Sequence, residues 1–283
     1  MALTRFQRTL CRVIAANRVQ QGESYVAGGA ALNLLAGGRR ISRDIDLFHD
    51  TVEALDASWQ ADRGVLMKHG YELTSVRERP AYVEAMVSKG DEVVLVQWTR
   101  DSSFRFFPLM QHEELGLVLH PFDLATNKTL ALIGRLEIRD WIDMITCHHH
   151  MQPLGYLAWA ACGKDPGFSP LAILEHASRS GRYTEVELEE LAFDGEPPNI
   201  GALSRQWQAM LAEAREIIQC LPTEHVGMCV LNRNGDAYTE NAHQLKQDLS
   251  KGELLFHAGR IRGAYPQIVR RKMNEELGTT NLH

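Results

Sequence analysis

The sequence predicts an α+β fold in which a mixed sheet comes first and a mostly helical region follows. A short apolar run at 24–27 ends in a glycine pair and is followed by helix-forming residues, which predicts a strand, a tight turn and a helix. Polar and apolar residues then alternate over 44–48, as in a strand with one polar face. Two strand-like runs, 81–88 and 92–99, flank a Lys-Gly-Asp turn and predict a β-hairpin.

Helical patterns dominate the rest of the chain. Apolar residues recur every three or four positions in 3–21, 51–69 and 121–146, the last as one long helix or two short ones. Beyond residue 150, several prolines and glycines interrupt the chain before further helical patterns at 170–181, 184–192, 201–221, 239–252 and 264–277, with a strand at 226–231. We therefore expect two domains, 1–150 and 151–283, of which the second is mostly helical.

Composition and charge exclude several classes of protein. The 283 residues are 45% hydrophobic and 23% charged, which is typical of a globular chain and not of a disordered one. The net charge of −6 excludes a uniformly basic nucleic-acid binder, although not a local basic patch. No apolar stretch has the length of a membrane span, no secretory signal is visible, and the five cysteines form no C-x-x-C pair. We expect a cytoplasmic protein.

The residues between 25 and 48 combine features that point to phosphate chemistry. Gly28 and Gly29 lie where a strand leads into a helix, so that backbone N–H groups can approach a phosphate and the helix N-terminus favours the anion. Asp44 and Asp46 are two positions apart on a strand, which points both carboxylates to one face. Two like charges so close are unfavourable unless a divalent cation lies between them or one is protonated. The pattern indicates Mg²⁺-dependent phosphoryl or nucleotidyl transfer with an NTP as substrate.

This segment and a second block resemble one group of proteins. A small-residue pair, a helix and a D-x-D strand are similar to the polymerase-β-type nucleotidyltransferase superfamily. The segment 122–132, followed by Arg139-Asp140, resembles the second block of the AbiEii/AbiGii-type nucleotidyltransferase toxins, where a lysine precedes an Arg/Lys-Asp pair by about a dozen residues. Here Lys128 precedes Asp140 by 12 residues. The resemblance covers residues 24–146, about half of the chain.

The resemblance implies a polymerase-β-like nucleotidyltransferase core with a mixed sheet. It also implies a role for each matching residue. Asp44 and Asp46 would be the metal ligands, Gly28 and Gly29 would hold the triphosphate with Ser42 as a nearby hydroxyl, Lys128 would neutralise phosphate charge, and Asp140 would organise the nucleotide pocket or orient the lysine.

The spacing of Lys128 and Asp140 adds an expectation about helix geometry. On one unbroken helix, twelve residues turn through about 1200°, which leaves these side chains about 120° apart. Gly134 lies between them and favours a bend. We therefore expect a kink or an interruption between 133 and 139.

Two positions depart from the superfamily pattern. Gly29 stands where many members have a serine. The third carboxylate, which a later strand usually adds, is replaced by Gln97, and Asp101 follows just after that strand. Whether Asp101 completes the site is open, and the alternative is a weak or missing general base.

These inferences favour an enzyme that transfers NMP from an NTP to an acceptor hydroxyl. The resemblance implies an RNA acceptor such as a tRNA 3′ end, and an antitoxin as partner. A small-molecule acceptor, as in antibiotic-modifying relatives, is one alternative. A second is a catalytically weak nucleotide-binding or interaction protein that keeps the fold.

Ordinary explanations remain open for each part. A glycine pair can be a plain turn, Asp-x-Asp can be a solvated strand face, and Lys128 with Asp140 can be a pair on a helix surface. In that case the motif is accidental in a structural protein. The segment 254–274 carries five basic residues and no acidic one, which suits an RNA backbone, a solvated helix face or an oligomer contact: Arg260, Arg262, Arg270, Arg271 and Lys272.

Overall fold

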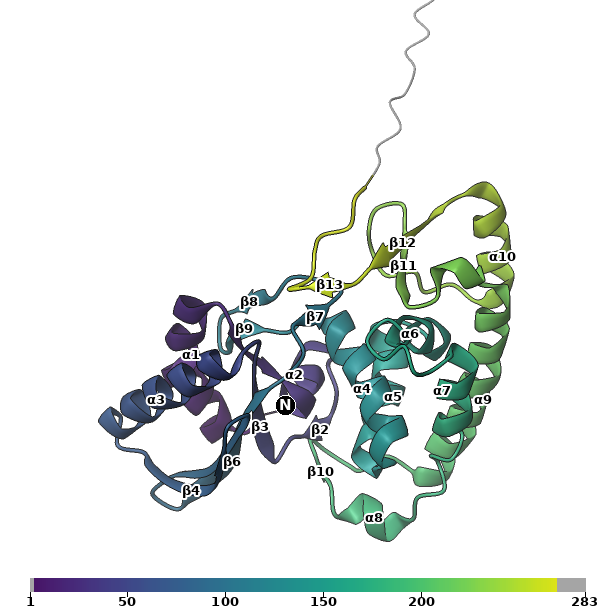
Figure 1. The fold of residues 1–283 in the computed structure, drawn as a ribbon. Helices are drawn as coiled ribbons and strands as arrows, with labels where there is room; N and C mark the ends of the chain where they lie inside the picture. Colours follow the sequence, from purple (N-terminus) through teal and green to yellow (C-terminus); the bar gives the residue numbers. More distant parts are fainter. Residues whose placement is uncertain (1–2, 269–283) are drawn as a thin grey trace, which may run out of the picture.

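The computed structural model describes residues 3–268 and contains a seven-stranded sheet with a helical lobe beside it (Figure 1). The first half of the chain contains α1 (Arg5–Gln21), β1 (Ser24–Ala27), α2 (Gly28–Leu35), β2 (Arg40–Ile41), β3 (Asp44–His49), α3 (Val52–Lys68), β4 (Glu72–Arg79), β5 (Tyr82–Lys89), β6 (Glu92–Arg100), β7 (Phe104–Arg105), β8 (Met110–His112), β9 (Gly116–Val118), α4 (Pro121–Arg135) and α5 (Ile138–His150). The second half contains α6 (Leu154–Ala161), α7 (Pro170–Ala177), α8 (Glu185–Glu189), β10 (Ala192–Phe193), α9 (Ile200–Cys220), β11 (Met228–Asn232), α10 (Ala242–Lys251), β12 (Leu254–Ala258) and β13 (Arg260–Ile261). The predicted α+β class, with a mixed sheet and a mostly helical second half, is confirmed.

The sheet has the strand order β4-β5-β6-β3-β1-β9-β8. Its central strand β3 pairs in parallel with β6 and antiparallel with β1. Helices α1 and α3 pack against each other and against the strands. Because side chains alternate along a strand, β3 buries Ile45 and Leu47 in the core and turns Asp44 and Asp46 to the other face. The alternation of polar and apolar residues predicted for this strand therefore separates the face that packs in the core from the face that carries Asp44 and Asp46.

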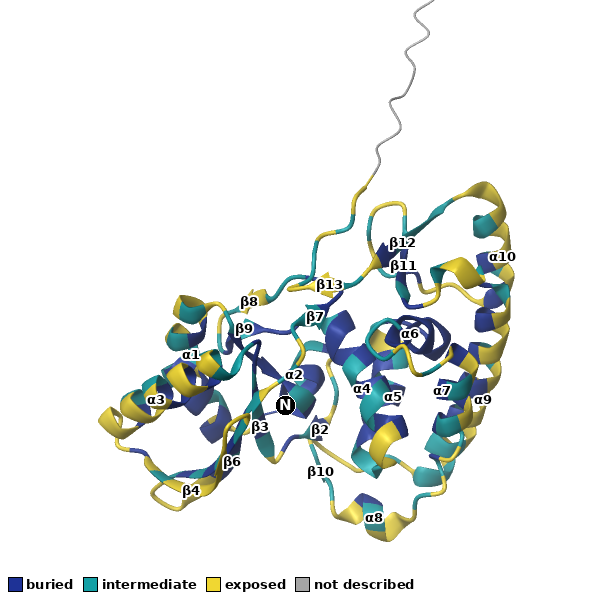
Figure 2. Ribbon diagram, in the orientation of Figure 1, coloured by how far each residue is buried: buried dark blue, intermediate teal, exposed yellow. Residues whose placement is uncertain are grey.

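The prediction found the central strands and missed the edges of the sheet. The hairpin β5–β6 and the strands β1 and β3 are confirmed. Strand β4 was missed because almost all of its residues are exposed, so that no apolar face marks it (Figure 2). Strands β8 and β9 have three residues each, too few for a periodic pattern.

The helical lobe forms around α6, whose eight residues are all buried. Helices α4, α7 and α9 pack against it, so α4 and α5 lie beside the helices of the second half (Figure 1). Two short strand pairs, β10 with β2 and β13 with β7, connect the second half back to the first. The boundary at residue 150 stays a prediction.

The end of the described chain differs from the prediction. Leu254–Ala258 forms strand β12, which pairs antiparallel with β11, because its apolar side chains pack on that strand. Residues 264–268 form no helix, and the remainder of the predicted helix, with Arg270, Arg271 and Lys272, lies outside the described residues. Over residues 3–268 we find no helix whose length and hydropathy would let it cross a membrane.

A buried histidine ends strand β3. His49 has no exposed surface, its Nε2 lies 3.0 Å from Ser24 Oγ, and its Nδ1 lies 3.3 Å from the carbonyl oxygen of Thr99. Burial lowers the pKa of His49 from 6.5 to about 4. Between these values the unfolded chain binds the proton and the folded chain does not. The contribution of uncharged His49 to the free energy of unfolding is therefore fully present above pH 6.5 and is lost as the pH falls toward 4.

We expect His49→Asn to flatten the dependence of stability on pH. The shift in the pKa of His49 corresponds to about 3 kcal/mol of unfolding free energy between pH 7 and pH 4. Urea unfolding at a series of pH values measures the slope, and His243→Asn, at an exposed position on α10, controls for the loss of one imidazole. An unchanged slope in His49→Asn would contradict this account.

Candidate active site

The two aspartates of β3 line a cavity of about 530 Å³ between the sheet and α4. Ser42 Oγ donates to Asp44 Oδ1 at 2.8 Å, and Arg139 Nη1 lies 3.8 Å from Asp44 Oδ2. Within residues 3–268, no side chain or backbone group donates a hydrogen bond to the carboxylate of Asp46. The pair is thus held in place at Asp44 and left open at Asp46.

The charge of this pair is only partly compensated. Burial and the nearby charge of Asp44 raise the pKa of Asp46 to about 6. Oxygen ligands of this kind, two on one strand face beside a cavity, are those that Mg²⁺ prefers. The residues present therefore fit a divalent cation held by Asp44 and Asp46.

The N-terminus of α2 lies directly against these carboxylates. Gly28 has a φ of 65°, and a Cβ there would lie 1.7 Å from Asp46 Oδ2, so only glycine fits. A Cβ on Gly29 would lie 2.5 Å from Arg40 Nη2 and 3.2 Å from Ser42 Oγ. No side chain caps α2, which leaves its first N–H groups available for an anion in the cavity that both glycines line.

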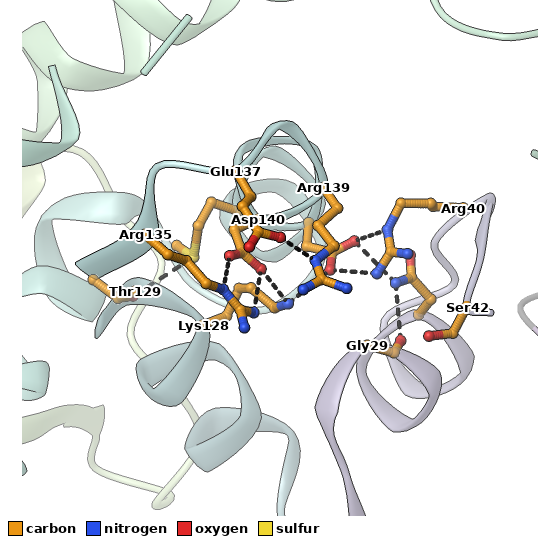
Figure 3. Close-up of polar contacts among 12 residues, drawn as sticks. Gly29, Arg40, Ser42, Lys128, Thr129, Arg135, Glu137, Arg139 and Asp140 are labelled. Carbon is orange, nitrogen blue, oxygen red and sulfur yellow. Dashed lines mark hydrogen bonds and ion pairs between the residues drawn. The ribbon is translucent and has the colours of Figure 1, made fainter. Parts of the chain in front are cut away.

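An ion cluster lies along one side of the cavity (Figure 3): Arg40, Lys128, Asp140 and Asp143 are buried, and Arg135 joins them from the exposed end of α4. Lys128 Nζ donates to Asp140 Oδ1 at 2.7 Å and lies 3.0 Å from Asp143 Oδ2. The guanidinium group of Arg40 donates two hydrogen bonds of 2.8 Å to the carboxylate of Asp143. Arg135 donates two to the carboxylate of Asp140, at 2.6 and 3.0 Å. Three cations share two carboxylates, so the cluster carries a net positive charge toward the cavity.

The protonation states of the cluster follow from this pairing. Burial alone would lower the pKa of Lys128, but Asp143 and Asp140 outweigh it and the pKa is raised. Burial would likewise raise the pKa of Asp143, yet Lys128 and Arg40 lower it to about 2. All members are therefore charged at neutral pH. One of the three N–H groups of Lys128 remains for a ligand in the cavity that it lines.

The break expected between Lys128 and Asp140 is confirmed. Helix α4 ends at Arg135, Leu136 takes a left-handed conformation with a φ of 51°, and α5 starts at Ile138. The break falls at Leu136 and not at Gly134, which stays helical. The alternative of a pair on a helix surface is wrong, because Lys128 is 6% exposed and Asp140 is fully buried.

The structure brings the predicted site residues together, and all of them except Asp140 line the cavity. Gly28, Gly29, Ser42, Asp44, Asp46 and Lys128 all line the cavity. Asp140 does not line the cavity and instead accepts hydrogen bonds from Lys128 and Arg135, which do. This position agrees with orienting the lysine, the second of the two roles that the resemblance implied.

The strand register answers the question about the third carboxylate. Gln97 of β6 lies directly beside Asp46 of β3 and donates to Glu84 Oε1 at 3.3 Å. Asp101 follows four residues later, and four strand residues span about 13 Å. Asp101 lines the far end of the cavity and does not replace Gln97. Across residues 3–268, no cluster of three or more His, Cys, Asp or Glu side chains could hold a metal ion.

Several cavity residues were missed from the sequence. Arg40 and Arg135 lie inside the quoted blocks, but their role depends on buried partners that only the fold brings together. Asn127 was within the second block without an assigned role. Lys164 and Phe104 come from segments outside both blocks, and no local signal marks them.

Comparison with known proteins supports the fold. No protein-family model and no curated protein matches the chain. The solved structure of JHP933 from Helicobacter pylori has a TM-score of 0.51 at 15% identity, covering 75% of this chain and 91% of that one. A candidate nucleotidyltransferase from H. pylori gives the same TM-score, identity and share of this chain, with 94% of its own covered.

A third solved structure is MenT4, a nucleotidyltransferase toxin from Mycobacterium tuberculosis. Its TM-score is 0.46 at 15% identity, covering 76% of this chain and 86% of that chain. The two likenesses above a TM-score of 0.5 show a shared fold. The predicted core therefore has the fold of these two structures, and membership of the nucleotidyltransferase superfamily and of the AbiEii/AbiGii-type family stays a prediction.

We expect Lys128→Met to lower the free energy of unfolding by about 3 kcal/mol, because it leaves two buried carboxylates short of a cation. Urea unfolding measures the loss, with Lys68→Met at an exposed position of α3 as the control. The double variant Lys128→Met/Asp140→Asn should recover part of it, since the two residues are in contact. Purely additive losses in the double variant would show that the pair is not coupled.

Proposed function

We propose that this protein transfers NMP from an NTP to an acceptor hydroxyl and releases pyrophosphate. The observation that carries the proposal is the pair of same-facing carboxylates, Asp44 and Asp46, lying against the uncapped N-terminus of α2 in one cavity. The nucleotidyltransferase-like fold agrees with this chemistry.

The chain's own residues would bind the triphosphate and receive the leaving group. The first N–H groups of α2 face the cavity beside the aspartates and would donate to the triphosphate, whereas the one proton of the Ser42 hydroxyl is donated to Asp44 Oδ1. Lys128, Arg135 and Arg139 line it from α4 and α5 and would offset the charge that develops on pyrophosphate. Asp140 and Asp143 fix Lys128 in advance, Asp140 fixes Arg135, and Glu137 pairs with Arg139, so little reorganisation would accompany the reaction.

Asp44 and Asp46 would hold Mg²⁺. Bound there, the metal supplies Lewis-acid stabilisation of phosphate charge and a lower pKa for the attacking hydroxyl. Ser42 orients Asp44 through its hydrogen bond, and the missing side chain of Gly28 leaves the space that the Asp46 carboxylate occupies.

The acceptor and the partner belong to this proposal on the family resemblance alone. That resemblance favours an RNA acceptor such as a tRNA 3′ end, an antitoxin as protein partner and a cytoplasmic location. The alternative acceptor is a small molecule with a free hydroxyl group.

A second candidate is a nucleotide-binding protein with weak turnover. The observation that favours it is Gln97, which lies beside Asp46 where an acidic side chain would accept the proton of the acceptor hydroxyl. An amide cannot take that proton at neutral pH.

The first test is transfer of label from each α-labelled NTP to total RNA in the presence of Mg²⁺. We expect labelled RNA with the wild type and none with Asp46→Asn. The fold should tolerate this variant, because it removes repulsion between two carboxylates. Asp56→Asn, at an exposed position of α3, is the matched control and should label RNA normally.

The transfer assay and a measurement of NTP binding together separate the candidate functions. Mg²⁺-dependent NTP binding without transfer to RNA or to a panel of small hydroxyl compounds favours the second candidate. No NTP binding by a folded wild type would exclude both.

We expect Gln97→Asp to increase the transfer rate if NTP turnover is limited by proton removal. The aspartate would lie beside Asp46 and supply a general base, an effect worth roughly 100-fold or more. Single-turnover rates at saturating NTP measure it, with Gln97→Glu testing the reach of the carboxylate. An equal or slower rate in both variants would show that the wild-type site does not lack a base.

A further inference from the structure

The cavity has two chemically different ends. Its cationic end, beside Asp44, is lined by Arg40, Arg135 and Arg139, and Lys128 lies between the two ends. Its aromatic end is lined by Phe48, Phe104, Ser102, Asn127 and Lys164.

Two elements fix the direction from one end to the other. On β3, Asp44, Asp46 and Phe48 share one face and line the cavity in that order. On α4, one helical face lines it in the opposite sense of the chain, from Arg135 at the cationic end through Ala131 and Lys128 to Asn127 and Leu124. A triphosphate drawn to the cationic end leaves the rest of the nucleotide to extend toward the aromatic end.

We propose that the aromatic end binds the nucleobase of the NTP and that the amide N–H groups of Asn127 select a base carrying a carbonyl oxygen. The inference rests on the proposed function and adds to it the residue that discriminates among nucleotides.

The orientation of the Asn127 amide is set by its neighbour. Lys164 Nζ lies 2.6 Å from Asn127 Oδ1, and an ammonium group can only donate, so the oxygen must face the lysine. The Nδ2 group then points away from Lys164. Within residues 3–268 it has no hydrogen-bond acceptor, and it is the part of the amide left for a ligand.

Lys164 is itself committed to the protein. Its ammonium group contacts Asp123 Oδ1 at 2.8 Å, the Asp123 carbonyl oxygen at 3.2 Å and Asn127. These three contacts use all three of its N–H groups. Asp123 in turn accepts the backbone N–H groups of Phe106 and Phe107 at 2.9 and 3.0 Å. The donor of Asn127 is therefore presented from a rigid support.

The surroundings suit a planar ring. Phe48 and Phe104 offer aromatic surface, on which any base can stack. Ser102 Oγ accepts the N–H of Phe104 at 3.2 Å, so its own O–H is a second donor facing this end. Fixed donors discriminate by leaving a mismatched ligand without its bond. Asp101 also lines this end as an acceptor, so the test below changes Asn127 alone.

The experiment compares dissociation constants for the four NTPs with Mg²⁺ and no acceptor, by calorimetry. UTP and ATP give the sharpest contrast, because uracil has two carbonyl oxygens and no amino group, and adenine has an amino group and no carbonyl. We expect the wild type to bind UTP more tightly than ATP. Asn127→Asp keeps an oxygen for Lys164 and replaces the donor by an acceptor, so the preference for UTP over ATP should fall about tenfold or more.

The ratio of the dissociation constants for ATP and UTP is unaffected by changes that weaken the binding of all nucleotides alike, such as the added negative charge. Asn234→Asp, in an exposed turn, carries the same change of charge and should leave the ratio unchanged. Asn127→Leu, which offers neither donor nor acceptor, should bind UTP and ATP with similar affinity.

Three results are decisive. A wild type that prefers ATP, or an Asn127→Asp ratio within twofold of the wild type, overturns the role of Asn127 while NTP binding still supports the proposed function. A folded wild type that binds no NTP overturns the proposed function itself.

Discussion

The buried carboxylate of Asp143 is the constraint on which the candidate site depends. It accepts Asn33 of α2, two hydrogen bonds from Arg40 of β2 and the charge of Lys128 of α4, and so ties three elements to α5. A buried charge is tolerated only when its hydrogen-bonding capacity is filled. The contacts that make Asp143 tolerable also fix where the glycine turn lies relative to α4, and hence the width of the cavity.

The opposite wall of the cavity, formed by β3, carries carboxylates that the protein does not fully pair. Strand β3 fills the core with one face and leaves Asp44 and Asp46 on the other, where Asp46 lacks a partner in the described chain. The raised pKa of Asp46 means that the fold bears a cost for keeping it charged. A cost of this kind is expected where a ligand, and not the protein, completes the interaction.

The sequence was informative wherever the physics is local. Alternation located β3 and its two faces, the glycine pair marked the start of α2, and helical geometry required the break between α4 and α5. It was uninformative wherever partners are distant in the chain: Lys164 reaches the cavity from the second half, and β4 has no apolar face. Gln97 was flagged from its place in the strand, but only the register with β3 shows that it lies beside Asp46.

The two walls together give the cavity its direction. One wall is a net-positive cluster with every carboxylate paired, and the other is a carboxylate pair in which Asp46 has no hydrogen-bond donor among residues 3–268. The proposed NTP complements both walls, because its triphosphate would match the charge of the first and, with a divalent ion, that of the second. The aromatic end also carries Lys164 and Asp101, but the three N–H groups of Lys164 are used by Asp123 and Asn127, so base recognition in the proposed binding mode would depend largely on stacking and on single hydrogen bonds. In the proposed binding mode, selectivity among nucleotides would depend on neutral groups such as Asn127, and the charged cluster would set affinity without discriminating between bases.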